Sequence, residues 1–122
     1  MSQDPEQIAR EVARYRWYHT IELADGVVTE GMFDHRAAVD RYLLPADLSG
    51  MRCLDVGTMD GFWAFEMERR GALEVLAADV NAVDDLDWPL HWRHRVETSL
   101  DETKMARFEL ARRALGARWA RA

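Results

Sequence analysis

Residues 52–80 contain the pattern that most restricts how this chain can fold. Two mostly apolar segments are separated by a short loop with a glycine at each end and by a segment of helical character. This strand–turn–helix–strand order spans about 30 residues, the size of a βαβ unit. Nearly continuous apolar strands are typical of parallel sheets covered on both faces, so we predict an α/β fold. The predicted pieces are strand 52–56, the loop from Gly57 to Gly61, helix 62–70 capped by Gly71, and strand 74–80.

Further elements are predicted on both sides of this unit. Asp4-Pro5 is typical of a helix start, and Asp25-Gly26 suits a tight hairpin turn. Gly31 is expected to interrupt the pattern after the hairpin. We therefore divide the chain into an extension over 1–45 and a second unit over 46–122. The other expected elements are a helix from Pro5 that carries Ile8, Val12 and Tyr15, two strands within 18–30, a helix over 35–44 that Pro45 ends, a helix from Asp101 or Thr103 to Leu115, and the start of a third strand within 117–122.

The composition is that of an acidic folded protein. Lys and Arg total 16 and Asp and Glu total 22 among 122 residues, so the formal net charge is −6. Phosphate contacts dominate affinity for nucleic acids, and we therefore expect no DNA binding. No apolar run approaches the roughly 18 residues of a transmembrane helix, so no membrane association is expected. The single cysteine, Cys53, excludes an internal disulfide, is expected to be a small buried residue, and favours a cytoplasmic location.

Basic side chains gather near the C-terminal end. Residues 104–122 hold six basic groups and one acid. One interpretation is a solvated helix face, because cations are favoured near a helix C-terminus. The other is a surface that contacts the phosphates of RNA.

The loop and the two strand ends place polar groups where open α/β sheets bind ligands. Gly57 permits a sharp turn after the strand, and Gly61 permits a ligand to approach the start of the helix and its amide groups. Asp79 closes the next strand, where a carboxylate can accept hydrogen bonds from ribose hydroxyls. The glycines follow G-x-x-x-G, not the G-x-G-x-x-G of nicotinamide sites. Alternatively, Asp55 and Asp79 only cap loops at strand ends.

One enzyme family resembles the chain in both the loop and the acid. Class I S-adenosylmethionine-dependent methyltransferases have a motif I similar to Leu54-Asp55-Val56-Gly57-Thr58-Met59-Asp60-Gly61, followed by an acid at the position of Asp79. Met59 stands where that motif commonly has its middle glycine. Segments 21–31 and 62–72 extend the resemblance over roughly 15–120. The branch that it resembles contains the tRNA wobble-uridine carboxymethyltransferases and their bacterial relatives.

This resemblance implies a fold, a cofactor and a reaction. The fold would be an incomplete Rossmann-like, doubly wound parallel sheet preceded by an N-terminal helix and β-hairpin. The reaction would transfer a methyl group from S-adenosylmethionine to a small-molecule or RNA acceptor. The tRNA-modifying members carry basic residues near the equivalent hairpin, whereas the first lysine here is Lys104, so the acceptor class stays open. The cofactor contacts implied are Asp55, Gly57, Thr58, Met59, Asp60, Gly61, Phe62, Asp79 and Val80.

The remaining candidates lie outside the motif. Trp17 and His19 precede the hairpin and either reach a substrate cavity or pack as rings on the sheet edge. No nucleophile–base pair is recognisable, so no catalytic residue is assigned. No metal site is predicted, because nothing fixes a ligand geometry for the two histidines near 91–94. The two histidines are His91 and His94, which lie near Asp84, Asp85 and Asp87. We expect Phe62, Trp63 and Phe65 to be core residues, and Phe62 is also a candidate for the lining of the cofactor cleft.

The chain is short for the implied fold. A doubly wound sheet has about six strands, or roughly 180 residues at about 30 for each strand–helix unit. We therefore expect the N-terminal part of a larger domain, with half of the cofactor site. The first strand would keep an unpaired edge, which invites association. The alternative function is thus a non-catalytic, methyltransferase-like fragment that associates with a partner chain or with itself through that edge.

Overall fold

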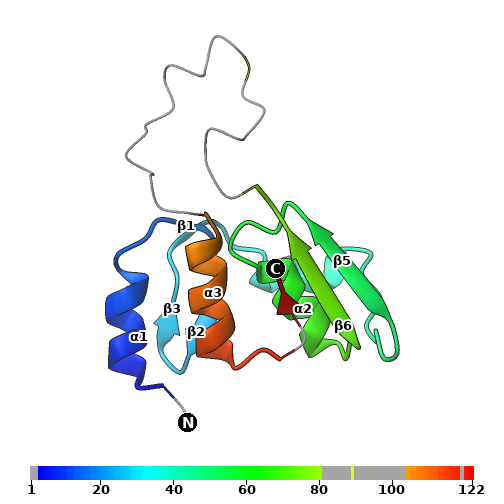
Figure 1. The fold of residues 1–122 in the computed structure, drawn as a ribbon, viewed down its shortest axis with the longest axis horizontal. Coiled ribbons are helices and arrows are strands. Elements are labelled where there is room, and N and C mark those ends of the chain that lie inside the picture. The colour runs from blue at the N-terminus through cyan, green and yellow to red at the C-terminus, as the bar shows by residue number, and fades with distance from the viewer. Residues whose placement is uncertain (1–2, 81–88, 90–103, 119) are drawn as a thin grey trace.

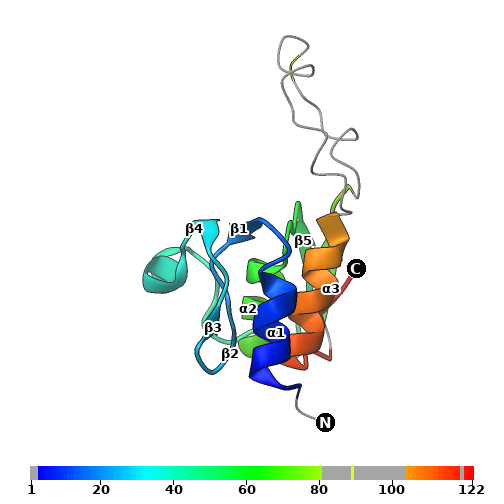
Figure 2. The same ribbon diagram turned by 90° about the vertical axis from the view of Figure 1, so that its left-hand side faces the viewer.

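The computed structural model describes residues 3–80, 89, 104–118 and 120–122. Figures 1 and 2 show a β-sheet with helices packed on one side, next to a group of short strands. In chain order the elements are α1 (Pro5–Val12), β1 (Trp17–His19), β2 (Glu22–Ala24), β3 (Val27–Val28), β4 (Gly31–Phe33), the 3₁₀ helix η1 (Arg36–Arg41), β5 (Arg52–Val56), α2 (Phe62–Arg69), β6 (Glu74–Ala78), α3 (Lys104–Leu115) and β7 (Ala120–Arg121).

The larger sheet confirms the predicted α/β fold class. Strands β5, β6 and β7 are parallel and lie in that order. Helix α2 connects β5 to β6, so the predicted βαβ unit is present with bounds within two residues of those expected. The expected third strand is also present, because Ala120 pairs with Val75 of β6. The fold is therefore mixed α/β with small parallel sheets.

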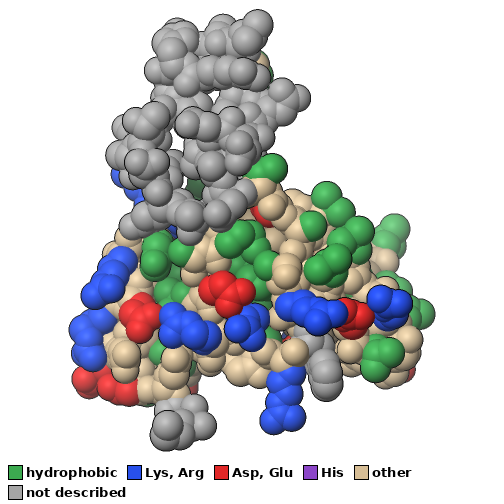
Figure 3. Space-filling view, viewed as in Figure 1, with side chains coloured by type: hydrophobic (Ala, Val, Ile, Leu, Met, Phe, Trp, Pro, Cys, Tyr) green, Lys and Arg blue, Asp and Glu red, His purple; other side chains and the backbone are tan. Residues whose placement is uncertain are grey.

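The two faces of this sheet differ, and the expectation that both are covered is wrong for the part of the chain that the structure describes. On the inner face, which packs against α2, Val75, Ala77 and Ala120 are buried. On the outer face, Leu54 is 60% and Val56 77% exposed. Figure 3 shows hydrophobic side chains gathered over β5 and β6. Right-handed crossovers that advance in one direction along a sheet place their helices on the same face, which leaves the other face open.

The hairpin is confirmed, and an unexpected strand pair flanks it. Strands β2 and β3 are antiparallel around Gly26, whose φ is +75°. Strands β1 and β4 then pair in parallel, with Trp17 opposite Gly31. The expectation that Gly31 interrupts the strands is therefore wrong. Gly31 begins β4, because a residue without Cβ allows the backbone there to approach β1 closely.

Three helices outside the βαβ unit test the predicted helix starts and ends. Helix α1 begins as expected, since the Asp4 side chain accepts a hydrogen bond from the Glu6 amide at 3.1 Å. The helix expected over 35–44 is instead the shorter η1. The backbone is already extended at Tyr42, three residues before Pro45. The ring of a proline disfavours a helical conformation in the residue before it, so a helix cannot easily continue up to Pro45. Helix α3 ends at Leu115, directly before Gly116, as predicted, and Gly116 has a φ of +64°.

A single core joins the extension to the sheet. Helix α3 packs against α1 and β2, and Phe108 on α3 stacks on Phe65 of α2 with ring centroids 5.2 Å apart. Ile8 and Trp17 from the extension belong to the same buried cluster as these rings. No helix among the described residues is long and apolar enough to cross a membrane.

Candidate functional site

The loop after β5 is a tight turn that is anchored to the end of β6. The backbone has positive φ at Gly57 (+75°), Met59 (+54°) and Gly61 (+97°). The amides of Gly57 and Thr58 both donate to the carbonyl of Ala78, at 2.7 and 3.1 Å. Met59 therefore occupies a left-handed conformation where glycine is more usual. Helix α2 starts directly after this turn, and Gly61 provides no side chain to cap its first amides.

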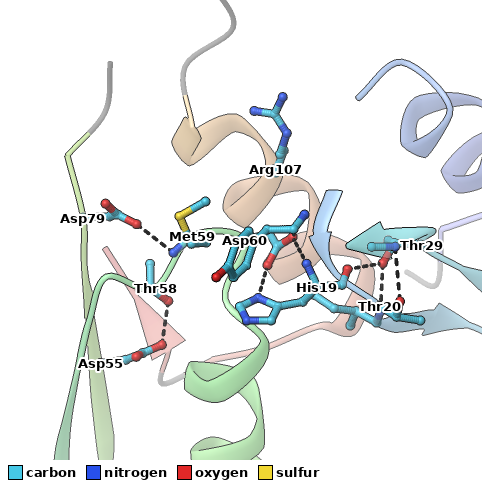
Figure 4. A network of polar contacts seen from close by, with 12 residues as sticks. His19, Thr20, Thr29, Asp55, Thr58, Met59, Asp60, Asp79 and Arg107 are labelled. Atoms are coloured by element: carbon cyan, nitrogen blue, oxygen red, sulfur yellow. Dashed lines mark hydrogen bonds and ion pairs between the residues drawn. The ribbon is translucent and has the colours of Figure 1, made fainter. Parts of the chain in front are cut away.

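Two carboxylates at the strand ends hold this loop from opposite sides. Asp79 accepts hydrogen bonds from the amides of Met59 and Val80, each at 2.8 Å. Asp55 accepts one from the Thr58 hydroxyl at 2.8 Å. Burial raises the pKa of Asp55 above its ordinary value, although the Thr58 hydrogen bond opposes this shift. Both acids thus make the loop-capping contacts considered above, and both also lie at the carboxyl ends of the parallel strands (Figure 4).

Asp60 points the other way, towards β1. Its carboxylate accepts hydrogen bonds from the amides of Tyr18 and His19, at 2.8 and 2.9 Å, and its second oxygen contacts the His19 ring at Nδ1. Figure 4 shows this contact on the side of the loop away from Asp79. The residues are 41 positions apart, and no local sequence pattern indicates the pair. Asp60, expected to contact a cofactor, is therefore used here to join the loop to the extension.

His19 lies within a group of aromatic rings. Its ring is 5.4 Å from that of Phe62 and 5.7 Å from that of His35, measured between centroids. Phe62 is buried, as predicted for a core residue, and it also borders His19. Sequence reasoning missed His35, whose ring is also close to those of Phe33, Tyr42 and Trp63.

Trp17 has a different place. It is buried, and its indole Nε1 donates to the carbonyl of Val12 at 3.0 Å. The side chain therefore holds the end of α1 against β1, within the extension. Of the two candidates before the hairpin, only His19 is brought beside the motif loop.

Several basic groups near the C-terminal end are engaged with other elements. Arg107 donates to the carbonyl of Arg16 and lies over the ring of Tyr15, 5.2 Å from its centroid. Arg113 pairs with Glu11 of α1, and Arg121 pairs with Glu74 of β6. Figure 3 shows basic and acidic side chains alternating across the face of the molecule that is turned to the viewer. These cations thus link α3 and β7 to the rest of the fold.

The histidine and aspartate group near 84–94 lies outside the described residues. Within the described ranges, no cluster of three or more His, Cys, Asp or Glu side chains is arranged to hold a metal ion. Comparisons with protein-family models, with curated proteins and with solved structures found no match to this chain.

The groups that the structure places at the loop fit a nucleoside cofactor with an amino-acid tail. Carboxylates at neighbouring strand ends can accept hydrogen bonds from hydroxyl and ammonium groups. Gly61 gives the first turn of α2 no side-chain cap, and although the Ala64 amide already bonds Asp55, the amides before it can donate to a carboxylate. A methyl group at Gly57 would meet no atom of the described residues within 4 Å, so among these residues the loop is open on that side.

Proposed function

We propose that this chain binds S-adenosylmethionine and contributes the cofactor-binding part of a class I methyltransferase with a Rossmann-like fold. The observation that carries the proposal is the Met59–Asp79 hydrogen bond of 2.8 Å, which ties a glycine-bounded loop to the acid of the neighbouring parallel strand. Asp79 and Val80 would hold the ribose, while Asp55 and the amides beyond Gly61 would hold the amino-acid tail. The cofactor supplies an electrophilic methyl group when bound. The acceptor is a small molecule or RNA, and the proposed location is the cytoplasm.

Replacing Asp79 with asparagine should weaken cofactor binding by about 10- to 100-fold. The amide oxygen can still accept from Met59, which keeps the bond between the loop and the end of β6, but the second acceptor, which faces the Val80 amide, and the negative charge offered to the ribose hydroxyls are lost. Hydrogen bonds to charged groups contribute roughly 1.5–3 kcal/mol, which corresponds to this range. Isothermal titration calorimetry with S-adenosylhomocysteine measures the effect.

The matched control is Asp47→Asn. Asp47 also accepts a hydrogen bond from a backbone amide in a turn, that of Ser49 at 2.9 Å, but it lies before β5 and away from the motif loop. This variant should bind S-adenosylhomocysteine as the wild type does. The proposal fails if the wild-type chain shows no binding at millimolar ligand, or if both variants lose affinity equally.

A second candidate function is assembly through the open side of the sheet. Among the described strands β5 pairs only with β6, so its other edge is open, and the apolar outer face begins at that edge. We propose a second copy of this chain as the occupant, because two-fold association brings the same edge and face from both copies together. The outer face also carries both charge signs in its Arg52–Glu74 pair, 3.2 Å apart.

Substituting Leu54 with glutamate should abolish this association without unfolding the monomer. Leu54 is largely exposed, so the charge removes apolar contact only in the assembly. The control is Leu43→Glu, which changes a fully exposed leucine that follows η1. Light scattering coupled to gel filtration should show a concentration-dependent dimer in the wild type and in the control. A wild-type monomer at high concentration excludes the second-copy interface.

A further inference from the structure

The contact between His19 and Asp60 determines which nitrogen of the imidazole carries hydrogen and which one has a lone pair that can accept a proton. The Asp60 carboxylate accepts the amides of Tyr18 and His19 on one oxygen and contacts His19 Nδ1 with the other. The His19 and Asp60 side chains are only 5% and 1% exposed. A carboxylate held by N–H donors is itself the acceptor, so Nδ1 must carry the hydrogen of this bond. A neutral His19 therefore has its lone pair on Nε2.

Nε2 is the ring nitrogen of His19 that makes no hydrogen bond among the described residues, since the ring bonds Asp60 through Nδ1. The side chain keeps 5% of its surface exposed. Figure 4 shows the second ring nitrogen pointing away from Asp60. The ring of Phe62 packs beside it, and the ionisable neighbours are Asp60, Asp55, His35 and Tyr18.

The motif loop places this histidine next to the proposed cofactor contacts. The Met59 amide donates a hydrogen bond to Asp79, and the next residue, Asp60, is hydrogen-bonded to His19. Two consecutive residues of the loop therefore connect His19 to the acid at the end of β6. We infer that His19 is the general base of the methyl transfer and that Asp60 is its positioning residue. This inference rests on the proposed function. It also narrows the acceptor, which must present an O–H or N–H group to His19.

The proton step can be written atom by atom. The bond between the acceptor atom and its hydrogen breaks, the electron pair stays on the acceptor atom, and the proton bonds to the lone pair of Nε2. The imidazolium that forms is stabilised by the Asp60 carboxylate at Nδ1–H. A positioned base of this kind contributes about 10²- to 10⁴-fold to a rate.

The tautomer of His19 provides a test that does not require the acceptor. Two-bond ¹H–¹⁵N correlation spectra of the full chain at about pH 8 should show hydrogen on Nδ1 of His19 and a lone pair on Nε2. The spectrum of a His19→Gln variant assigns the signals. Adding S-adenosylhomocysteine should shift the Nε2 signal. A ring with hydrogen on Nε2, a ring that is still protonated, or an Nε2 signal unchanged when calorimetry shows saturation overturns the inference.

The Asp60→Asn variant tests the positioning role. Its amide oxygen can accept the two backbone amides, while its NH₂ group faces Nδ1 and forces the hydrogen onto Nε2. We expect inversion of the tautomer with S-adenosylhomocysteine affinity within about threefold of the wild type. The control, Asp34→Asn, removes an exposed carboxylate that pairs with Arg36, and it should leave the tautomer unchanged. Retention of Nδ1–H in Asp60→Asn overturns the positioning role, and the wild-type spectrum decides the tautomer even if this variant does not fold. Absence of ligand binding by the wild type defeats the proposed function separately.

Discussion

Replacing Gly31 with alanine should destabilise the protein by at least about 3 kcal/mol, a large share of the 5–15 kcal/mol typical of a small domain. The methyl group would overlap the backbone of His19 and Thr20 in the paired strand β1. Backbone atoms cannot rotate aside as a side chain can, so the β1–β4 pair must separate. Overpacking of this kind costs about 1–3 kcal/mol where side chains yield, and more where they cannot. Urea unfolding followed by tryptophan fluorescence measures the loss.

Gly26→Ala is the control for this substitution. Gly26 lies in the neighbouring hairpin turn, where its φ of +75° is unfavourable for alanine, but a Cβ there would meet no atom of the part of the chain that the structure describes within 4 Å. The left-handed conformation alone costs about 1–2 kcal/mol. Gly31 has no positive φ, so a loss there no larger than that at Gly26 would show that β4 and β1 can adjust to a methyl group at little cost.

The parts of the fold that the sequence predicts are those with local signals. The Asp4 cap, the turn at Gly26 and the glycine-bounded loop after β5 each depend on the conformational preference of one or two residues, and each is present. The β1–β4 pair has no such signal. Parallel strands usually need a long crossover, and here the hairpin between Trp17 and Gly31 provides it.

In the candidate site, too, the sequence predicts what local signals determine and misses what long-range packing determines. The positions of Asp55 and Asp79 at strand ends follow from the alternation of strand and helix, which a periodic pattern indicates. The Asp60–His19 contact joins residues 41 positions apart and depends on how the extension packs against the sheet. Because Asp60 lies inside a loop that resembles a cofactor-binding motif, the sequence alone favours a ligand role for it. Packing also decides the place of Trp17, whose buried indole bonds to α1.

Arg70→Met should cost about 3–5 kcal/mol, whereas the matched Arg69→Met should cost less than about 1 kcal/mol. Both guanidinium groups bond the buried carboxylate of Glu66. The Arg70 side chain is 8% exposed and also donates to the carbonyls of Leu44 and Pro45, at 2.9 and 3.2 Å. The Arg69 side chain is 69% exposed, so water replaces most of what it loses. Breaking a buried pair costs far more than breaking an exposed one. Urea denaturation measures the loss of stability in each variant. Equal losses would contradict the inference that Arg70 holds residues 44–45 in place through its hydrogen bonds.

Unfolding at low pH tests the contribution of the Glu66 carboxylate to its ion pairs with Arg69 and Arg70. Burial alone would raise the pKa of Glu66, but the hydrogen bonds and charges of Arg69 and Arg70 outweigh it and hold the pKa below its ordinary value of 4.5. The folded state therefore binds this proton less readily than the unfolded chain. Its contribution to stability is fully present above pH 4.5 and is lost as the pH falls through the lower folded value. Between these limits Glu66→Gln should lose less stability on acidification than the wild type, measured by urea unfolding at successive pH values. Parallel losses would mean that other carboxylates govern acid unfolding.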